Sequence, residues 1–302
     1  MVAVSEAARD TAVAPRGPGR RLSVFFFRHP MLRLVLLAFL PLGFLVVAYL
    51  GSLFLLLINA FWTTNSFTGD VVHTWSLTNF STLFEQDVYR IVTGRSLGAA
   101  LVVTVMDAII ALPIAFYMAK VASPRVQKLL VVAVLTPLWA SYLVKAYAWR
   151  TLFATDGVFD WALSPFGVSS PGYGYWTAVI TLGYLWLPYM ILPIYASMER
   201  LPNSLLDASA DLGAHTMRTL RSVVLPIIFP GIVAGSIFTF SLTMGDYIAV
   251  QIVGGKVTFL GNVVYANVTY NLPLAAALSM VPIVVILLYL ALVRRSGALR
   301  EL

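Results

Sequence analysis

The chain has 302 residues, of which 60% are hydrophobic and only 11% charged, with a formal net charge of +7. Soluble globular domains carry about 25% charged residues, so this composition indicates a protein that lies in a lipid bilayer. Cysteine is absent and the three histidines lie far apart, which argues against a metal site, a thiolate nucleophile and disulfide bonds. The basic residues flank apolar runs and form no stripe beside aromatic residues, so we reject a nucleic-acid partner.

Residues 1–30 are rich in Arg, Ala, Pro and Gly and precede the first long apolar run. The apolar residues 25–27 are too few for a signal peptide and are followed at once by Arg28. We therefore predict a cytoplasmic N-terminal tail over residues 1–30, with an interfacial aromatic patch near its end.

Six later stretches are long and apolar enough to cross a bilayer, which takes about 20 helical residues each. They lie near residues 32–61, 93–118, 127–150, 174–197, 227–249 and 272–293. The sequence thus predicts an all-α membrane protein with six transmembrane helices. Its membrane domain extends over residues 31–298, and residues 299–302 form the C-terminus.

Basic residues near the ends of the spans predict the orientation of the chain. Fifteen of the 20 Lys and Arg residues fall on one side, in the tail, the 120–128 turn, the 199–223 segment and the C-terminus. We expect that side, with both termini, to be cytoplasmic.

The segment 203–226, between the fourth and fifth predicted spans, is too polar to insert in a bilayer and has the pattern of helix, turn and helix. Ser204 is placed to cap the first helix, and Gly213 suits the left-handed position that ends it. Thr216 can cap a second helix that stops before Pro226. This pattern alone is equally compatible with an ordinary turn between two spans and with a corner that a partner domain grips.

The spacing of this segment resembles the signature loop of ABC importer permeases, in which Glu-Ala-Ala is followed after three residues by Gly and after nine more by Ile-x-Leu-Pro. Here Asp207 replaces Glu, Ser209 replaces Ala and Val223 replaces Ile, while every spacing is kept. In that family the loop docks into a groove of the ATPase subunit and passes ATP-driven motion to the spans. The resemblance implies this coupling role for six residues: Asp207, Ala208, Ser209, Gly213, Leu225 and Pro226.

Three further stretches resemble the spermidine/putrescine class of these permeases: residues 137–150, residues 187–195, and residues 244–247 followed by Gly254 and Gly255. The resemblance implies the type I ABC importer permease fold, in a bacterial cytoplasmic (inner) membrane, with a cytoplasmic coupling helix. It also implies three partners, namely an ABC ATPase dimer, a second, homologous but non-identical permease and an extracytoplasmic solute-binding protein. Opines, amino-acid-like solutes and sugars remain alternative substrates.

The sequence carries no ATP-binding loop of its own, because Gly255-Lys256 lacks both the earlier glycine and the following hydroxyl residue of that motif. We expect a non-catalytic subunit without a cofactor, whose ATP and Mg²⁺ are bound by the partner ATPase. A membrane hydrolase would need a nucleophile motif such as Gly-x-Ser-x-Gly, which does not occur. A secondary transporter, the other alternative, would be expected to show internal repeats, and none is found.

Two acidic residues fall within predicted spans, where an acid costs about 2.5–3.5 kcal/mol on insertion and so usually marks a functional site. They are Asp107 and Asp246. Asp246 either contacts a cationic solute or caps a broken helix beside Gly245. Asp107 either faces solute or is paired with Lys145 or a hydroxyl group. Aromatic residues that line the same path or form an interfacial belt are Trp139, Tyr142, Tyr184, Trp186, Tyr189 and Tyr247.

Overall fold

The computed structural model describes residues 30–65 and 68–295, so the predicted tail with its aromatic patch and the last residues of the chain lie outside the described residues. The chain divides into two compact units, residues 1–56 and 57–302. In the first unit α2 (Pro30–Phe44) continues through a π-helical turn, η1 (Leu45–Leu50), into α3 (Gly51–Asn59). Residues Leu37–Asn59, of which the last three belong to the second unit, form a candidate membrane span, as the apolar run predicts.

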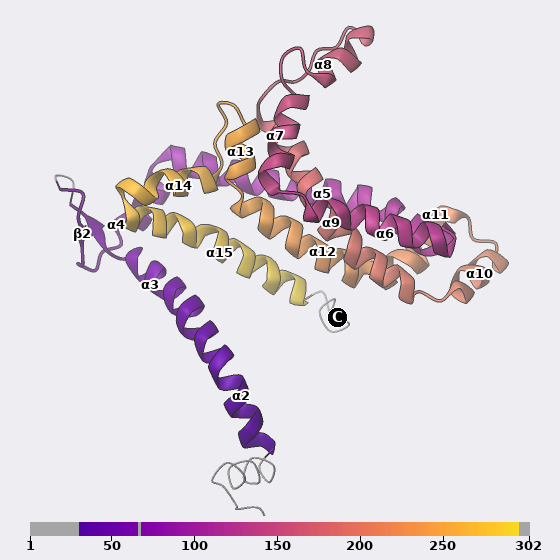
Figure 1. Ribbon diagram of the computed structural model, residues 1–302, viewed down its shortest axis with the longest axis horizontal. Helices are drawn as coiled ribbons and strands as arrows, with labels where there is room; N and C mark the ends of the chain where they lie inside the picture. Colours follow the sequence, from indigo (N-terminus) through magenta and orange to yellow (C-terminus); the bar gives the residue numbers. More distant parts are fainter. Residues whose placement is uncertain (1–29, 66–67, 296–302) are drawn as a thin grey trace, which may run out of the picture. The chain divides into compact units, whose positions relative to one another are not determined.

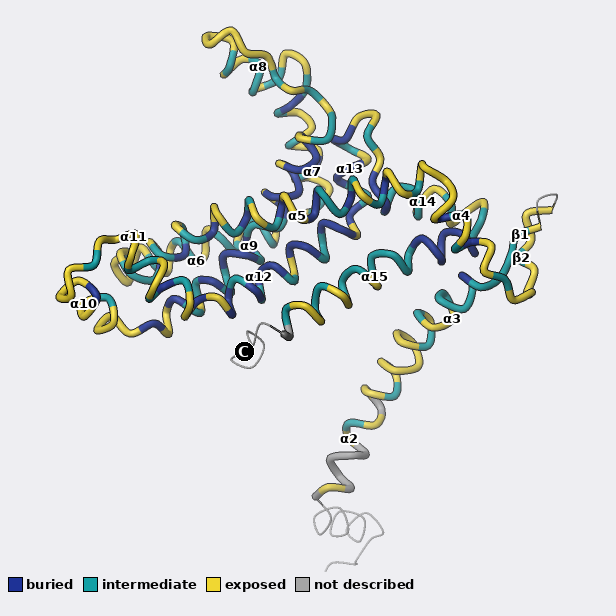
Figure 2. The backbone as a smooth tube through the Cα atoms, turned by 180° about the vertical axis from the view of Figure 1, so that it is seen from behind, coloured by how far each residue is buried: buried dark blue, intermediate teal, exposed yellow. Residues whose placement is uncertain are grey.

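The second unit contains four further uninterrupted spans. α5 (Asp87–Phe116) extends through η2 (Tyr117–Val121), α9 comprises Tyr175–Arg200, and α15 comprises Leu272–Arg295. α11 (Thr216–Thr219), η4 (Leu220–Val224) and α12 (Leu225–Gly245) form one continuous helix. Figure 1 shows α5, α9 and α12 side by side, and Figure 2 shows that α9 and α12 carry many of the buried residues.

Short elements connect these spans. A hairpin of β1 (Thr63–Thr64) and β2 (Val71–Val72) pairs Thr63 with Val72, and α4 (Thr78–Glu85) follows it. The remaining elements are α6 (Pro124–Trp139), α7 (Tyr142–Leu152), α8 (Val158–Leu163), η3 (Ser164–Phe166), α10 (Asn203–Asp211), α13 (Ile248–Val253) and α14 (Leu260–Tyr270). The all-helical class predicted from the sequence is therefore confirmed, with one small hairpin added.

Small residues allow the central helices to approach one another closely. A Cβ atom added at Gly231 of α12 would lie 2.6 Å from the carbonyl oxygen of Pro193 in α9, and one added at Gly235 would lie 3.0 Å from the Cα atom of Met190. Within a bilayer such close packing replaces the hydrophobic effect as the main attraction between helices. Gly231 and Gly235 thus allow the close approach of α9 and α12.

The span predicted over residues 127–150 is not one straight helix: α6 and α7 together are long and apolar enough to cross a membrane, but the chain bends by 94° between them. Ala140 and Ser141 are extended at the bend, three residues after Pro137. Helical backbone groups freed at a break inside a membrane need new partners. The ammonium group of Lys145 supplies one by donating a hydrogen bond to the Pro137 carbonyl at 3.0 Å.

Two other predicted boundaries also differ from the structure. The fifth span ends at Gly245, because Asp246 is extended and a separate helix, α13, begins at Ile248. At its other end the helix does not stop before Pro226 but passes through that residue into α12. The π-helical turn η4 ends at Val224, two residues before Pro226. A wider turn of this kind accommodates the proline ring and the N–H that proline lacks.

Candidate functional site

Four of the six predicted coupling residues lie in a corner between α9 and α12, here called the α10–α11 corner (residues 201–224). The other two, Leu225 and Pro226, are the first residues of α12. Gly213 ends the first helix with φ of 74°, in the left-handed region that a glycine adopts without steric cost. Its N–H bonds the Ala210 carbonyl at 2.8 Å, and the N–H of Ala214 bonds the Ser209 carbonyl at 3.1 Å. These two bonds define a Schellman motif, so the predicted role of Gly213 in the turn is confirmed.

The predicted side-chain caps of the two short helices are not found. α10 begins at Asn203 after Pro202, one residue too early for Ser204 to act as a cap. α11 begins at Thr216 itself, so His215 occupies the cap position, and neither helix has a capping side-chain bond. The Schellman motif and the tertiary contacts of the corner maintain its shape instead.

Three hydrogen bonds hold the α10–α11 corner together and join it to α5–η2. The hydroxyl groups of Ser209 and Thr219 lie 2.8 Å apart and join α10 to α11. The ammonium group of Lys120, at the end of α5–η2, donates to the Leu201 carbonyl at 2.5 Å and to the Asn203 side chain at 3.1 Å. The corner is therefore joined to the end of α5–η2, a helix distant from it in sequence.

The remaining predicted coupling residues differ in their exposure. Asp207, Ala208 and Gly213 lie on the exposed surface of the corner, while Ser209 is buried against Thr219. Beneath the corner is an apolar cavity of about 610 Å³ between α10, α11 and the ends of α5 and α9. Its lining includes Leu112, Phe116, Met198, Leu206, Ala210 and Leu220.

A second group of predicted residues meets where the fifth span is broken. The carboxylate of Asp246 is only 8% exposed and accepts hydrogen bonds from the Tyr142 hydroxyl and from the Ala249 N–H, the latter at 3.0 Å. Asp246 thus caps α13, which is one of the two roles expected from the sequence. Because Tyr142 is the first residue of α7, this bond also joins the breaks of two spans.

Aromatic rings adjoin this carboxylate. The rings of Tyr142 and Trp186 are stacked with centroids 6.0 Å apart, and Tyr189 lies 6.0 Å from Trp186. The buried indole nitrogen of Trp186 has no hydrogen-bond partner among the described residues. The structure therefore brings together a carboxylate, three aromatic rings and an unused donor from α7, α9 and the α12–α13 break.

Three of the predicted aromatic residues lie elsewhere. Trp139, at the end of α6, is 90% exposed. Tyr184 packs against Trp149, with ring centroids 5.2 Å apart. Tyr247 stacks on Tyr265 at 4.7 Å.

Asp107 is 1% exposed within α5, and neither of its carboxylate oxygens has a hydrogen-bond partner among the described residues. It packs against α9, where a Cβ atom added at Gly183 would lie 3.1 Å from its Oδ1. The expected pairing with Lys145 is not found, because the ammonium group of Lys145 bonds the Pro137 carbonyl.

The sequence interpretation missed two residues that support the broken spans. Lys145 satisfies the carbonyl left free at the α6–α7 bend, and Pro137 within an apolar run was the available signal for that bend. Asn262 accepts from the Phe259 N–H at 3.1 Å and donates to the Tyr247 carbonyl at 2.9 Å. Its position three residues after the N-cap residue Phe259 is typical of a capping side chain.

The fold and the α10–α11 corner define the class of protein, a non-catalytic membrane permease subunit. Residues 111–298 match the model of the binding-protein-dependent transport system inner membrane component, and the chain belongs to this family. The family confirms an ABC transporter permease of the inner membrane, without a cofactor of its own, that works with a periplasmic binding protein and an ATPase that uses the ATP.

Known relatives agree with this assignment. The chain is 45% identical to the inner membrane ABC transporter permease protein YdcU of Escherichia coli strain K12, over 96% of this chain and 98% of that protein. It is 33% identical to the spermidine/putrescine transport system permease protein PotB of Haemophilus influenzae, over 68% of this chain and 73% of that protein. A bacterial alginate ABC transporter crystallised with its periplasmic protein has the same fold, with a TM-score of 0.65 at 16% identity over 90% of this chain and 95% of that one.

Proposed function

We propose that this chain is a permease subunit of a polyamine importer, which moves linear cations such as spermidine and putrescine from the binding protein into the cytoplasm. The observation that carries the proposal is the buried Asp246 carboxylate among aromatic rings at the break of two spans. Relatives named as spermidine/putrescine permeases support the same substrate class.

The negative charge of the intramembrane side chains and the aromatic rings beside Asp246 favour a cationic solute. A carboxylate provides an ion pair to an ammonium group, and the faces of Tyr142 and Trp186 add cation–π attraction. A path for anions would be expected to present Lys, Arg or helix N-termini, whereas the intramembrane acids here are Asp107 and Asp246. Other small solutes, such as opines, amino-acid-like compounds or sugars, are the alternative.

In the structure the Asp246 carboxylate is held by contacts within this chain. Its two oxygens already accept hydrogen bonds from Tyr142 and from the backbone of Ala249. An incoming ammonium group would replace the Tyr142 hydroxyl on the carboxylate. This exchange would separate α7 from the α12–α13 break, so the same contact would act as gate and as substrate contact.

Coupling to ATP hydrolysis is assigned to the α10–α11 corner. Asp207 and Ala208 are exposed for contact with the ATPase, and Lys120 ties the corner to α5. Force applied to α10 would therefore reach the α5 and α9 spans through that bond and through the apolar contacts of Leu206. This role requires the corner and both termini to be cytoplasmic, as the distribution of basic residues predicts.

A second, non-identical permease would complete the translocation path, as in the class that the sequence resembles. An active complex that contains only this permease, the ATPase and the binding protein would contradict this part of the proposal.

Reconstitution of the full complex in proteoliposomes tests the substrate assignment. We expect uptake of labelled spermidine or putrescine, and a loss of uptake in Asp246→Asn, which keeps the size of the side chain and removes its charge. A charged hydrogen bond contributes about 1.5–3 kcal/mol, which corresponds to a loss of about tenfold to more than a hundredfold. Uptake of only neutral or anionic solutes by the parent would refute the polyamine assignment, and equal uptake by the variant would remove Asp246 from the path.

A further inference from the structure

Buried polar groups without a hydrogen-bond partner are rare in folded proteins, and in this chain they gather on the central helices. Among the described residues, four carry buried side-chain nitrogen or oxygen atoms that have no partner: Asp107, Thr181, Trp186 and Thr243. They lie on α5, α9 and α12, which pack side by side (Figure 1). Neither the coupling role of the α10–α11 corner nor the proposed solute contact of Asp246 accounts for them.

Asp107 is the group whose missing partner costs the most free energy. Its side chain is 1% exposed, and both of its carboxyl oxygens lack a partner within the described part of the chain. The hydroxyl group three residues before it on α5 is already engaged, since Thr104 donates to the Ala100 carbonyl at 2.7 Å. A buried polar group that bonds to nothing loses its hydration without compensation. A partner from outside the chain is therefore expected at Asp107.

The indole N–H of Trp186 is the complementary group, a buried donor without an acceptor. Gly183 of α9 faces Asp107, because a Cβ atom added there would lie 3.1 Å from the Asp107 Oδ1. Residues three apart share one face of a helix, and a long side chain covers the turn that precedes it. Trp186 therefore leans over the turn of α9 that contains Gly183, so the free donor and the free acceptor adjoin the same turn.

The packing of α5 against α9 supports this placement. Trp186 packs against the buried cluster that includes Val103 and Leu182. Val103 lies four residues before Asp107, and so on the same face of α5. Thr181 is turned by about 200° from Gly183 around α9, because it lies two residues away. Its free hydroxyl group therefore belongs to the other side of the helix.

We infer that a buried water molecule joins Asp107 to Trp186, and that through this water Asp107 is a positioning residue for the aromatic pair at the proposed gate. The water accepts a hydrogen bond from the indole N–H and donates one to the carboxyl group. The indole ring held in this way is stacked on Tyr142 with centroids 6.0 Å apart, and Tyr142 donates to Asp246. The positioning role rests on the proposed gate at Asp246, whereas the water site does not.

A water molecule fits these two groups better than an ion does. Asp107 and Trp186 do not bond to each other directly, and one water spans such a gap between polar groups. Water accepts from an N–H and donates to a carboxyl oxygen, whereas a cation binds only the oxygen and an anion only the N–H. Among the described residues, no group of three or more His, Cys, Asp or Glu side chains is placed to hold a metal ion.

Each ring of the aromatic pair is then held by one acid. Asp246 accepts from the Tyr142 hydroxyl, and Asp107 holds the Trp186 indole through the water. Without the water contact the Trp186 ring is free to turn away from Tyr142. The contact between α7 and the α12–α13 break is weakened as a result, although neither Tyr142 nor Asp246 is changed.

The hydrogen bond of the Trp186 indole is measured by ultraviolet resonance Raman spectroscopy of the assembled complex in lipid nanodiscs. Each spectrum is taken minus that of the same protein with Trp186→Phe, which isolates this residue. We expect a hydrogen-bonded indole in the parent and in Asp107→Asn, which keeps an acceptor, and a free indole in Asp107→Val. Thr181→Val is the matched control, because it removes another buried polar group without a partner and should leave the Trp186 band unchanged.

ATP hydrolysis in the absence of binding protein tests the positioning role. We expect Asp107→Val and Trp186→Phe each to raise this basal rate about two- to tenfold, the range for the loss of one hydrogen bond. The double variant should be no faster than either single variant, because both changes remove the same contact. Thr181→Val should keep the parent rate. Increases that multiply in the double variant would overturn the positioning role.

A map of the assembled complex that resolves ordered water is an independent test of the site, and it needs no variant to fold. It should show one water within about 3.2 Å of both groups. A direct bond between the two side chains, or a gap without water, would overturn the site, as would an unchanged indole band in Asp107→Val. A bonded indole with a parental basal rate in both variants would refute the positioning role alone. None of these measurements depends on the solute, so a failure of the polyamine assignment is distinguishable from a failure of this inference.

Discussion

The substitution Gly213→Ala changes the backbone preference of the α10–α11 corner without crowding any neighbouring atom. Gly213 has φ of 74°, and a Cβ atom added there would have no neighbour within 4 Å. The cost of the substitution is therefore only that of holding a residue with a Cβ atom in the left-handed region, about 1–2 kcal/mol. The turn of the Schellman motif should become about 5- to 30-fold less populated. Asn tolerates this region better, so Gly213→Asn should have a smaller effect.

Two glycines in the same chain provide matched controls. Gly69 has φ of 76° and open space around it, so Gly69→Ala carries the same backbone cost at a site far from the corner. An added Cβ atom at Gly94 also has no neighbour within 4 Å, and Gly94 has no positive φ, so Gly94→Ala should not lower the free energy of unfolding. Neither control should alter coupling.

The assay is ATP hydrolysis stimulated by loaded binding protein, measured beside solute uptake in proteoliposomes, with association of the ATPase followed separately. In Gly213→Ala we expect weaker association and fewer solute molecules moved per ATP, with Gly213→Asn intermediate. Wild-type association and uptake in Gly213→Ala would refute the coupling role of the corner. Equal losses in Gly69→Ala would show that the effect is general destabilisation.

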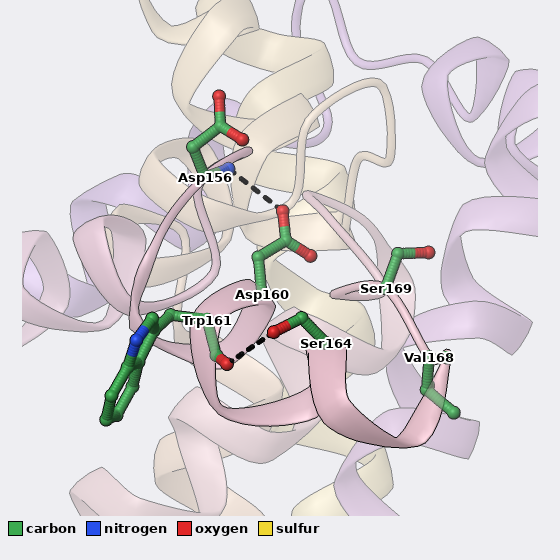
Figure 3. Close-up of a pocket in the computed structure, with 7 residues that line it drawn as sticks. Asp156, Asp160, Trp161, Ser164, Val168 and Ser169 are labelled. Atoms are coloured by element: carbon green, nitrogen blue, oxygen red, sulfur yellow. Dashed lines mark hydrogen bonds between the residues drawn. The ribbon is translucent and has the colours of Figure 1, made fainter.

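Three further predictions follow from single contacts. Gly235→Ala should lower the free energy of unfolding by about 1–3 kcal/mol through overpacking, because the added Cβ atom would lie 3.0 Å from the Cα atom of Met190. An unchanged melting temperature of the purified complex would contradict this. Tyr142→Phe removes one donor from the Asp246 carboxylate and should raise ATP hydrolysis in the absence of binding protein, and a basal rate equal to that of the parent would contradict the gate. Because the folded pKa of Asp160 is depressed by its hydrogen bonds from the Ser170 and Asp156 N–H groups, the stability that its charge gives residues 153–173 is present at neutral pH and is lost only as the pH falls through that lowered pKa, below 3.8. Figure 3 shows the bond from Asp156. Proteolysis within residues 153–173 should thus be constant from about pH 8 to about pH 5 and faster in Asp160→Asn at all of these values.

Much of this protein is determined locally, and the sequence alone predicts that part. Runs of about 20 apolar residues identify the spans because a helix satisfies its own backbone hydrogen bonds in the bilayer, so length and hydropathy are sufficient. Gly213 was predictable for the same kind of reason, since a left-handed residue after a short helix favours glycine whatever surrounds it. The spacing from Asp207 to Pro226 identified the family without any tertiary information.

Only the tertiary structure shows which distant side chains meet. Tyr142 and Asp246 are 104 residues apart, and their hydrogen bond depends on how α7 packs against α13 after a 94° bend. The sequence is apolar on both sides of that bend, so hydropathy does not reveal it. The Pro137 carbonyl that the bend leaves free accepts a hydrogen bond from Lys145, which lies within the same apolar run. Whether Asp107 and Lys145 form a pair was likewise beyond the sequence. Side-chain partners in a bilayer are selected by the close packing of particular helix faces, which composition and spacing do not encode.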